Sequence, residues 1–531
     1  MARPNLCSSR PTGRSAPGGR HRRLLAYTGY GSIVISECNT GGATAVTQEK
    51  VVLNHLDPAS ALAFGLLIFS LLMVVMFEAT NGFHDAANAV ATVIYTKSLA
   101  PGQAVVLSGF MNFIGVLVGG IAVAYALVEL LPAEVLSPPD GGPAVAMLLS
   151  LFIAALSWNI GTWWLGLPNS SSHCLIGSLI GVALGNAFAR SRSLADGVHW
   201  PQLWKVLEAL ALSPILGLVL AGGLYLLCRR TLHDKNLYEP VVEKPVWWMR
   251  AMLILTCSGV SFSHGTNDGQ KSIGLIMLTI IGLFPATYAL NPAGKEPMSA
   301  LPAIMLQAAP LIQKYGDDEK AAALAAVRSI EGENRSRQAG ESPIESTTRP
   351  TQDFPKLEAG PTPAAKRRGS VRDDVYQVIS ELKHTEETSG ISEGEKKQAQ
   401  QLGKQLGQFV EYAPLWVRLL SAVCLGVGTM IGYQRIVKTL GERLGNVHMT
   451  PAQGASAEVV GAILIGTAGF TGLPVSTTHI ITAGIAGTMV SSGAGLRYGM
   501  ISRILIAWVL TLPMTILIAG GLYYVFTNPG F

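Results

Sequence analysis

The chain has 531 residues, of which 49% are hydrophobic and only 14% are charged, and its formal net charge is +5. A composition so poor in charge, with apolar runs of about 20 residues, excludes a soluble or intrinsically disordered chain and indicates an integral membrane protein. The six cysteines are scattered without a CxxC spacing. We therefore expect neither a disulfide framework nor a zinc site, and no cofactor is predicted.

Residues 1–58 form a tail rich in Arg, Gly, Ser and Thr, and they show no amphipathic period. This composition predicts disorder. A signal peptide is the alternative, because the basic run at residues 20–23 precedes an apolar patch, but polar residues interrupt that patch and no clear cleavage site follows.

Eight apolar runs after the tail are candidate membrane spans. They cover residues 61–77, 105–131, 144–165, 206–228, 252–284, 415–436, 459–469 and 501–526. Two shorter apolar pieces, residues 175–188 and 480–490, suit re-entrant or half helices better than full spans.

A motif of eight residues occurs twice in the chain. Residues 166–173 read GLPNSSSH and residues 472–479 read GLPVSTTH, each directly before one of the short apolar pieces. A proline followed by hydroxyl residues is typical of the start of a helix, where unpaired N–H groups and the positive end of the dipole attract an anion. The duplication favours anion binding over the alternative, in which small hydroxyl residues only let membrane helices pack closely.

A second duplication carries the acidic groups. The first span continues from residue 79 as ATNGFHDAANAVATVIYT, and residues 263–274 read SHGTNDGQKSIG. The alignment pairs Gly82 with Gly265 and Asp85 with Asp268. Because an ionisable side chain is costly in hydrocarbon, a carboxylate at this depth indicates function. We expect the helix to break in mid-membrane at these glycines.

The spacing between the two motifs locates an insertion. From Asp85 to Pro168 there are 83 positions, whereas from Asp268 to Pro474 there are 206. Hydrophilic residues 291–413 account for nearly all of the difference, and we interpret them as a cytoplasmic insert that is a solvated linker, helical around residues 373–382. A regulatory or docking role is the alternative. The predicted divisions are therefore 1–58, 59–290, 291–413 and 414–531.

Two clusters of basic residues are candidates for the cytoplasmic face, because short cytoplasmic loops carry an excess of Lys and Arg. The first cluster is Arg229, Arg230, Lys235, Lys244 and Arg250, and the second is Arg435, Lys438 and Arg443.

The four motif stretches resemble the signature of the inorganic phosphate transporter (PiT) family, and their form resembles the bacterial low-affinity phosphate permeases most closely. The resemblance implies an all-α polytopic membrane protein with two inverted repeats, broken helices, re-entrant hairpins and roughly ten transmembrane helices. It also implies a multi-pass protein of the cell (inner) membrane that imports inorganic phosphate, free or as a metal-phosphate complex, by cation symport. A proton is the favoured coupling ion, sodium is the other candidate, a homo-oligomer is possible, and no nucleic-acid partner is expected.

The motifs supply the predicted site residues. The substrate-binding candidates are Asn88, Ser171, Ser172, Asn267, Gln270, Lys271, Thr477 and Thr478, and the coupling-cation candidates are Asp85, Asp268 and Glu78. Two interpretations of Glu78 stay open. It is a ligand for a proton or cation, or it caps the broken helix. For Lys271 we keep three interpretations: a phosphate ligand, a substitute for a coupling cation, and a plain ion pair with Asp268. The motif histidines (His84, His173, His264 and His479) are expected to hold re-entrant backbone rather than a metal ion.

Two other functions compete with phosphate symport. A membrane hydrolase would use the Ser, His and Asp of the motifs, but nucleophilic catalysis needs one asymmetric set, whereas both halves present similar groups. We therefore do not expect an enzyme. A permease for sulfate or another oxyanion is the stronger alternative, because hydroxyl donors and helix ends do not separate such anions well.

Overall fold

The computed structural model describes residues 27–28, 32–33, 58–128, 130–131, 143–198, 200–241, 244–292, 294, 297–316, 320–338, 363–388 and 390–528. The chain divides into two compact units, Met1–His55 and Leu56–Phe531. In the first unit, β1 (Tyr27–Thr28) pairs antiparallel with β2 (Ser32–Ile33). The rest of the predicted disordered tail lies outside the described residues, up to Pro58, where the first helix begins.

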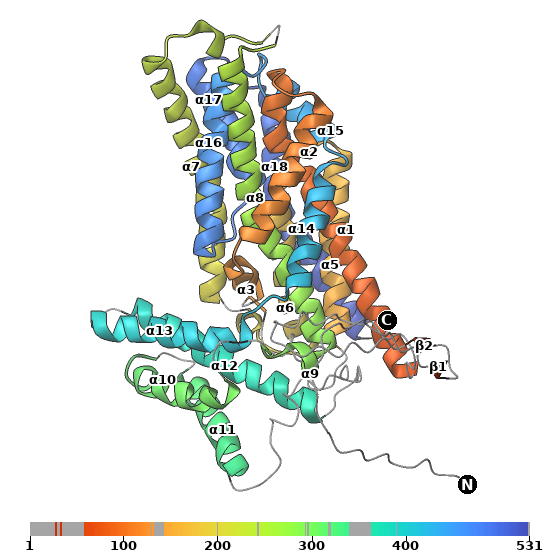
Figure 1. Ribbon diagram of the computed structural model, residues 1–531, viewed down its shortest axis with the longest axis vertical. Helices are drawn as coiled ribbons and strands as arrows, with labels where there is room; N and C mark the ends of the chain where they lie inside the picture. The colour runs from red at the N-terminus through yellow and green to blue at the C-terminus, as the bar shows by residue number, and fades with distance from the viewer. Residues whose placement is uncertain are drawn as a thin grey trace, which may run out of the picture. The chain divides into compact units, whose positions relative to one another are not determined.

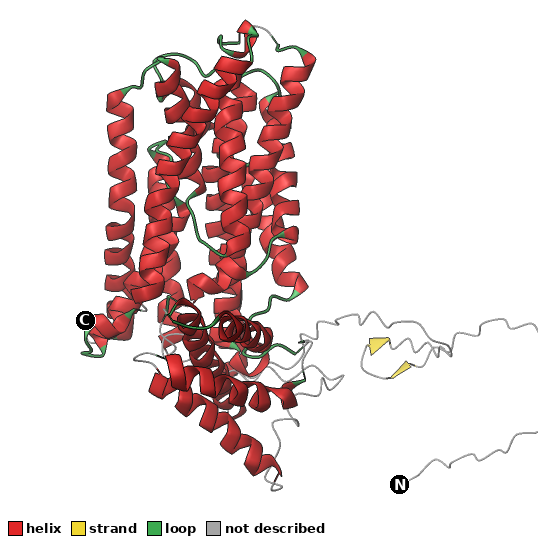
Figure 2. Ribbon diagram, turned by 90° about the vertical axis from the view of Figure 1, so that its left-hand side faces the viewer, coloured by secondary structure: helices red, strands yellow, loops and turns green. Residues whose placement is uncertain are grey.

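The second unit is almost entirely helical, and its long helices run side by side along the vertical axis of Figures 1 and 2. The bundle helices are α1 (Pro58–Tyr95), α2 (Pro101–Val118), α3 (Ala122–Val128), α5 (Pro143–Trp164), α6 (Ser171–Ala189), α7 (Trp200–Thr231), α8 (Trp247–Leu283), α14 (Leu415–Thr429), α15 (Gln434–Lys438), α16 (Pro451–Thr471), α17 (Thr477–Ser492) and α18 (Tyr498–Thr527). Short turns η1 (Leu194–Gly197), η2 (Lys235–Leu237) and the π-helical η5 (Thr439–Arg443) connect some of them.

Seven of the described helices are long and apolar enough to cross a membrane, or eight if the bent pair Glu393–Val410 and Leu415–Thr429 counts as one span. The bundle also contains α8, which has 37 residues and carries the polar motif, and α14 and α17, which have 15 and 16 residues. These three and the seven candidate spans together agree with the roughly ten helices expected from the sequence.

The expected breaks at Gly82 and Gly265 are absent, because α1 and α8 run through both motifs without interruption. The glycines serve close packing instead. A Cβ on Gly82 would lie 2.7 Å from the backbone of Gly428 in α14, and one on Gly265 would lie 2.3 Å from the carbonyl oxygen of Asn112 in α2. Each motif helix therefore packs backbone against backbone on a helix of the opposite half.

The chain breaks at the two GLP motifs, and the hairpins that they form enter the bundle from opposite ends. The α5–α6 hairpin places Asn186 beside Tyr523 near the end of α18, whereas in the α16–α17 hairpin Gln453 donates to Ser492 at the opposite end. Helices α1 and α8 are antiparallel, since Arg250 at the start of α8 donates to the Ser98 carbonyl just after α1. The repeats are therefore inverted, as expected.

The inserted segment is a folded subdomain rather than a solvated linker. It contains α9 (Pro285–Tyr288), the turn η3 (Met298–Ala300), α10 (Leu301–Tyr315), α11 (Lys320–Gln338), α12 (Pro363–Glu387) and α13 (Glu393–Val410). Buried side chains such as Met305, Val375 and Leu406 form a separate apolar core. The predicted helical stretch lies within α12. Sequence periodicity in one helix could not show that four helices share this core.

Hydrogen bonds hold the two ends of the insert together. Asn291 N–H donates to the Phe409 carbonyl at 2.8 Å, so the chain enters and leaves the subdomain at one place. The buried guanidinium of Arg372 donates to the carbonyl oxygens of Ala289 and Val410 at 2.9 and 2.8 Å. The subdomain is thus an insertion with adjacent ends.

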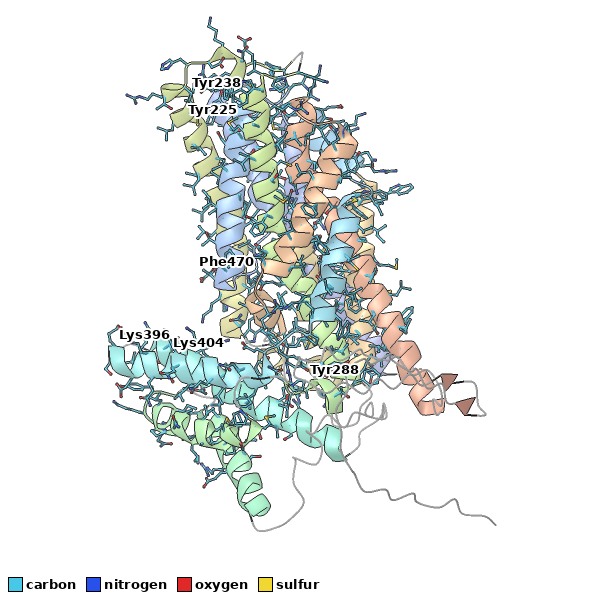
Figure 3. All side chains as sticks on the ribbon, in the orientation of Figure 1. Tyr225, Tyr238, Tyr288, Lys396, Lys404 and Phe470 are labelled. Atoms are coloured by element: carbon cyan, nitrogen blue, oxygen red, sulfur yellow. The ribbon has the colours of Figure 1, made fainter. Side chains whose placement is uncertain are left out.

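The insert and the basic loop before α8 lie at opposite ends of that helix. Figure 3 shows this separation, with Tyr225 and Tyr238 at one end and Lys396 and Lys404 on α13 at the other. A 37-residue helix is about 55 Å long, which is longer than the hydrocarbon core of a bilayer. The insert and the basic loop therefore cannot both face the cytoplasm, and the two expectations exclude each other.

Candidate anion and cation site

The two hairpin tips present capped helix starts. Ser170 and Ser476 have extended backbones and are the N-caps of α6 and α17, and each accepts a hydrogen bond from the backbone N–H of the histidine three positions later at 3.2 Å. Hydroxyl residues occupy the first turn of both helices. The serine-rich motifs thus form the helix starts predicted from sequence, the type of place where an anion binds.

Asp85, on α1, meets the tip of α17. The hydroxyl of Thr478 donates to Asp85 Oδ1. Asn88, one turn further along α1, lies with its side-chain nitrogen 3.5 Å from Asp85 Oδ1 and 3.2 Å from Thr478 Oγ1. All three side chains are buried. The acidic motif of the first half is therefore tied to the hydroxyl motif of the second.

Asp268, on α8, meets the tip of α17 directly and the tip of α6 through Lys271. Its Oδ1 accepts from Lys271 Nζ at 2.6 Å and from Thr477 Oγ1 at 3.1 Å. Lys271 also donates to Ser172 Oγ at 2.5 Å and to the Val475 carbonyl at 3.2 Å. Two acids, one ammonium and hydroxyls from both tips thus gather at one buried place.

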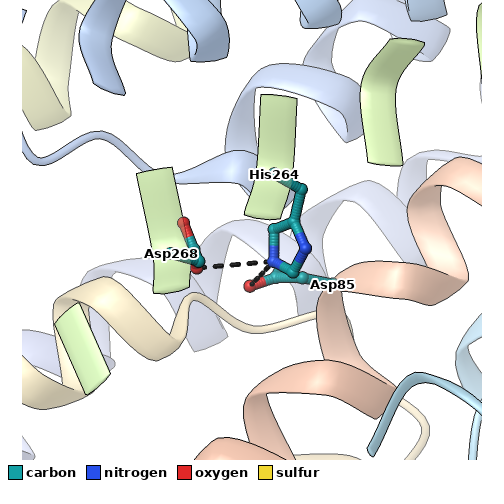
Figure 4. Close-up of side chains that lie close together, drawn as sticks. All are labelled: Asp85, His264 and Asp268. Carbon is teal, nitrogen blue, oxygen red and sulfur yellow. Dashed lines mark ion pairs between the residues drawn. The ribbon is translucent and has the colours of Figure 1, made fainter. Parts of the chain in front are cut away.

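A third group lies between the two aspartates. Figure 4 shows His264 with its Nε2 3.6 Å from Asp85 Oδ2 and 3.5 Å from Asp268 Oδ2. The ligand atoms of these three side chains lie within 4.8 Å of one another, close enough to hold one cation. On the other side of the ring, His264 Nδ1 lies 2.6 Å from Asn112 Oδ1. Such a partner fixes the ring's orientation, as it does for metal-binding histidines.

Asn81 completes the polar surroundings of the acids. With its amide oriented so that the nitrogen faces them, it donates to Asp85 Oδ2 at 2.9 Å, to Ser171 Oγ at 3.0 Å and to Asp268 Oδ2 at 3.3 Å. One amide therefore links both acids to the tip of α6.

Three of the predicted site residues lie outside the group of side chains around the two aspartates or make few contacts with it. The Gln270 amide contacts backbone groups only: it donates to the carbonyls of Thr266 and Gly469 and accepts from Val123 N–H. Asn267 donates to the Leu473 carbonyl at 3.3 Å. Glu78 is buried, and its Oε1 has no hydrogen-bond partner among the described residues. The contacts of Gln270 are those of a residue that joins α8 to α3 and α16.

The other motif histidines lie mostly against the hairpins. His84 Nε2 is 2.8 Å from the Asn159 carbonyl on α5, and His173 Nδ1 is 2.8 Å from its capping Ser170. His173 and His479 come from the two tips, and their ring centroids lie 4.4 Å apart. His264 differs from them, because it faces the two acids. Sequence reasoning did not select His264, Asn81 or Asn112 for the site, although His264 lies in a duplicated motif.

This architecture defines a class of protein. Two inverted halves of a helical membrane bundle meet at buried helix starts and carboxylates, which is how secondary transporters build their ion and substrate sites.

Comparison with known proteins gives the family. Residues 81–519 match a family model described as "Phosphate transporter family". The chain is 39% identical to the low-affinity inorganic phosphate transporter PitA of Escherichia coli (strain K12), over 86% of this chain and 96% of that protein. It is 37% identical to a low-affinity inorganic phosphate transporter of Buchnera aphidicola subsp. Acyrthosiphon pisum, over 89% and 99%. The chain therefore belongs to the phosphate transporter family, and the expectation that it is not an enzyme is confirmed.

A solved structure described as "The sodium-dependent phosphate transporter" has the same fold. It matches with a TM-score of 0.54 and covers 87% of this chain and 99% of its own, at 17% sequence identity. At that identity the likeness concerns the fold alone.

Proposed function

We propose that this protein imports inorganic phosphate across the cell (inner) membrane by symport with a cation, and that the coupling ion is a proton. The observation that carries the proposal is the meeting of two helix starts from opposite halves at a pair of buried aspartates. Membership of the family and the relatives' printed names support phosphate as the substrate.

The charges explain why transport would be coupled. A phosphate that approaches the tips of α6 and α17 comes close to Asp85 and Asp268, which repel it unless positive charge lies between them. The Asp85–His264–Asp268 cluster can hold that charge as a proton or as a cation. Anion and cation then bind better together than either does alone. A divalent metal that enters with phosphate would satisfy the same requirement.

The geometry supports the predicted residues to different degrees. Ser171, Ser172, Thr477 and Thr478 lie in the first turns of the capped helices, and Asn88 adjoins them, so we assign these five to the anion. Lys271 stays a prediction as a phosphate ligand, because its ammonium already contacts Asp268 and Ser172. Asp85 and Asp268 are assigned to the cation. Glu78 stays a prediction as a cation ligand, and Asn267 and Gln270 stay predictions as substrate ligands.

The test is uptake of labelled phosphate into proteoliposomes under imposed proton or sodium gradients. We expect an inward proton gradient to drive uptake and excess sulfate to compete poorly. Preferential uptake of sulfate would favour the alternative of an oxyanion permease with the same fold. Absence of uptake of either anion under every gradient would refute the proposal. Uptake that requires an added divalent metal would identify a metal-phosphate complex as the form transported.

A further inference from the structure

The two halves of the site differ by one charge. Asn88 follows Asp85 by three positions, as Lys271 follows Asp268. Asn88 contacts Asp85 and Thr478, whereas Lys271 contacts Asp268 and Ser172, and Thr478 and Ser172 hold the same position in their GLP motifs. An ammonium group in the second half therefore occupies the place that a neutral amide has in the first.

The ammonium of Lys271 is fully engaged. Its three hydrogens can be assigned to three acceptors: Asp268 Oδ1, Ser172 Oγ and the Val475 carbonyl. The side chain is 2% exposed and lies between α8 and both hairpin tips. It would have to give up one of these partners to become an additional donor to a free anion.

The ammonium also leaves the Asp85–His264–Asp268 cluster open to a cation. Lys271 binds Oδ1 of Asp268, while Oδ2 of the same carboxylate faces His264 and Asp85. Two ionised carboxylates lie at this place, and two positive charges would balance them. With Lys271 in place, one of those charges is built into the protein.

We propose that Lys271 is a fixed cation that takes the place of one mobile coupling cation at Asp268. This inference rests on the proposed cation symport. It follows that the site accepts a single mobile cation, in the Asp85–His264–Asp268 cluster, and that sodium is excluded from the Lys271 side of Asp268 by the ammonium.

The experiment compares the wild type with Lys271→Asn, which recreates the amide of Asn88, and with Lys271→Arg, which keeps the charge. Thermal unfolding of the purified proteins is measured with increasing sodium chloride, and choline chloride controls for ionic strength. We expect sodium to raise the unfolding temperature of Lys271→Asn by several degrees and to leave wild type and Lys271→Arg unchanged. Equal responses of wild type and Lys271→Asn to sodium would overturn the inference, whether or not the variant transports.

Transport gives a second measurement. In proteoliposomes, the number of positive charges that move with each phosphate should be larger by one in Lys271→Asn than in wild type, and uptake by the variant should become sodium-dependent. The double variant Asn88→Lys with Lys271→Asn moves the fixed charge to the other half and should return to the wild-type ratio. An unchanged ratio in an active Lys271→Asn refutes the fixed cation, whereas failure of the wild type to transport phosphate would refute the proposed function instead.

A separate observation concerns the orientation of the insert. At the end of the bundle where α8 begins, the contact of Arg250 with Ser98 and that of Arg497 with Leu444 bring several short connections together. The basic residues there are Lys97, Arg229, Arg230, Lys235, Lys244, Arg250, Arg435, Lys438, Arg443, Arg497 and Arg503. The described short connections at the insert end carry far fewer, namely Arg190, Arg192, Lys205 and Arg418.

We infer that the basic end faces the cytoplasm and that the helical insert lies on the extracytoplasmic side. Short cytoplasmic loops are enriched in Lys and Arg, whereas loops longer than about 60 residues do not count toward this rule. The insert, residues 291–413, is such a long loop, so its own charges do not decide the orientation. The sequence prediction of a cytoplasmic insert relied on its hydrophilic character, which does not distinguish the two sides.

The test uses single cysteines in a variant whose six native cysteines are replaced. Lys404→Cys is on the exposed face of α13, and Lys235→Cys is exposed at the basic end. A membrane-impermeant maleimide should label Lys404→Cys in intact spheroplasts and Lys235→Cys only after permeabilisation. The reverse pattern would overturn the inference. Alkaline phosphatase inserted at Gly390 in the native-cysteine protein gives an independent measurement, since it becomes active only outside the cytoplasm.

Discussion

Thr478, in the first turn of α17, donates its hydroxyl hydrogen to the carboxylate of Asp85 in α1, although 393 positions separate the two residues. The contact joins the hydroxyl motif of one half to the acidic motif of the other. On the opposite side of the site, Lys271 in the second half donates to Ser172 in the first. Because each half completes the site of the other, movement of one hairpin changes the surroundings of both acids.

The first prediction concerns the acids. Asp85→Asn and Asp268→Asn should each abolish cation-coupled phosphate uptake, because the amide keeps the shape of the side chain but removes the charge that holds the cation. Uptake is measured in proteoliposomes at equal reconstituted amounts, and gel filtration checks folding. The exposed variant Glu393→Gln on α13 is the control. Wild-type uptake by either aspartate variant would show that its carboxylate has no part in coupling.

The sequence predicted part of this site for a physical reason. A duplicated motif specifies the same local structure twice, so the pairs Asp85/Asp268 and Ser172/Thr478 could be selected without a structure. Asn112 belongs to no duplicated motif, and only the packing of α2 on α8 brings it to His264. Gln270 lies in a motif, yet its neighbours are backbone groups of α3 and α16, and residue type alone does not reveal which face of a helix a side chain occupies.

In the fold, too, some features follow from a sequence pattern and others only from packing. Apolar runs indicate the membrane helices, but the low helix propensity of glycine also predicts breaks at the glycines of the acidic motifs. Tertiary packing outweighs that cost where Gly82 lets α1 lie directly against α14. The inversion of the repeats likewise required the direction of each helix, which the contact between Arg250 and Ser98 provides.

The hydroxyl groups give the second prediction. Ser172→Ala and Thr478→Ala should each weaken phosphate binding, since a hydrogen bond to a charged group contributes about 1.5 to 3 kcal/mol, equivalent to about 10- to 150-fold in affinity. Binding is measured by calorimetry on purified protein. Ser178→Ala is a matched control, because Ser178 is buried in the same helix as Ser172 and donates to the Cys174 carbonyl. Equal affinities of wild type and both site variants would mean that these hydroxyls serve only packing.

The third prediction concerns removal of the insert. Replacing residues 298–406 with a short flexible linker should leave basal transport largely intact, because the site residues lie on α1, α6, α8 and α17. The linker can close the gap, since Asn291 and Phe409 are already hydrogen-bonded. The shortened protein is compared with wild type for membrane insertion and for phosphate uptake. Loss of uptake by a correctly inserted protein would assign the insert to the transport machinery.

The last prediction concerns the stability of the insert at different pH. Burial raises the pKa of the Asp373 carboxyl to about 7, nearby Arg372 acts in the opposite direction, and Asp374 adds to the rise. Below about pH 4 the carboxyl is protonated in both folded and unfolded chains, so it contributes no pH dependence there. Between about pH 4 and 7 the unfolded chain loses the proton while the folded chain keeps it, so stability falls as pH rises.

Asp373→Asn cannot ionise and should remove this loss, which is on the order of a few kcal/mol above pH 7. The measurement is amide hydrogen exchange of α12 in the full-length protein, with wild type and variant compared at each pH, so that the intrinsic pH dependence of exchange cancels. The variant should exchange more slowly than wild type near pH 8, and the ratio of the two rates should change steadily as pH falls toward 4. A ratio that stays constant over this range would show that Asp373 ionises equally readily in the folded and unfolded chain.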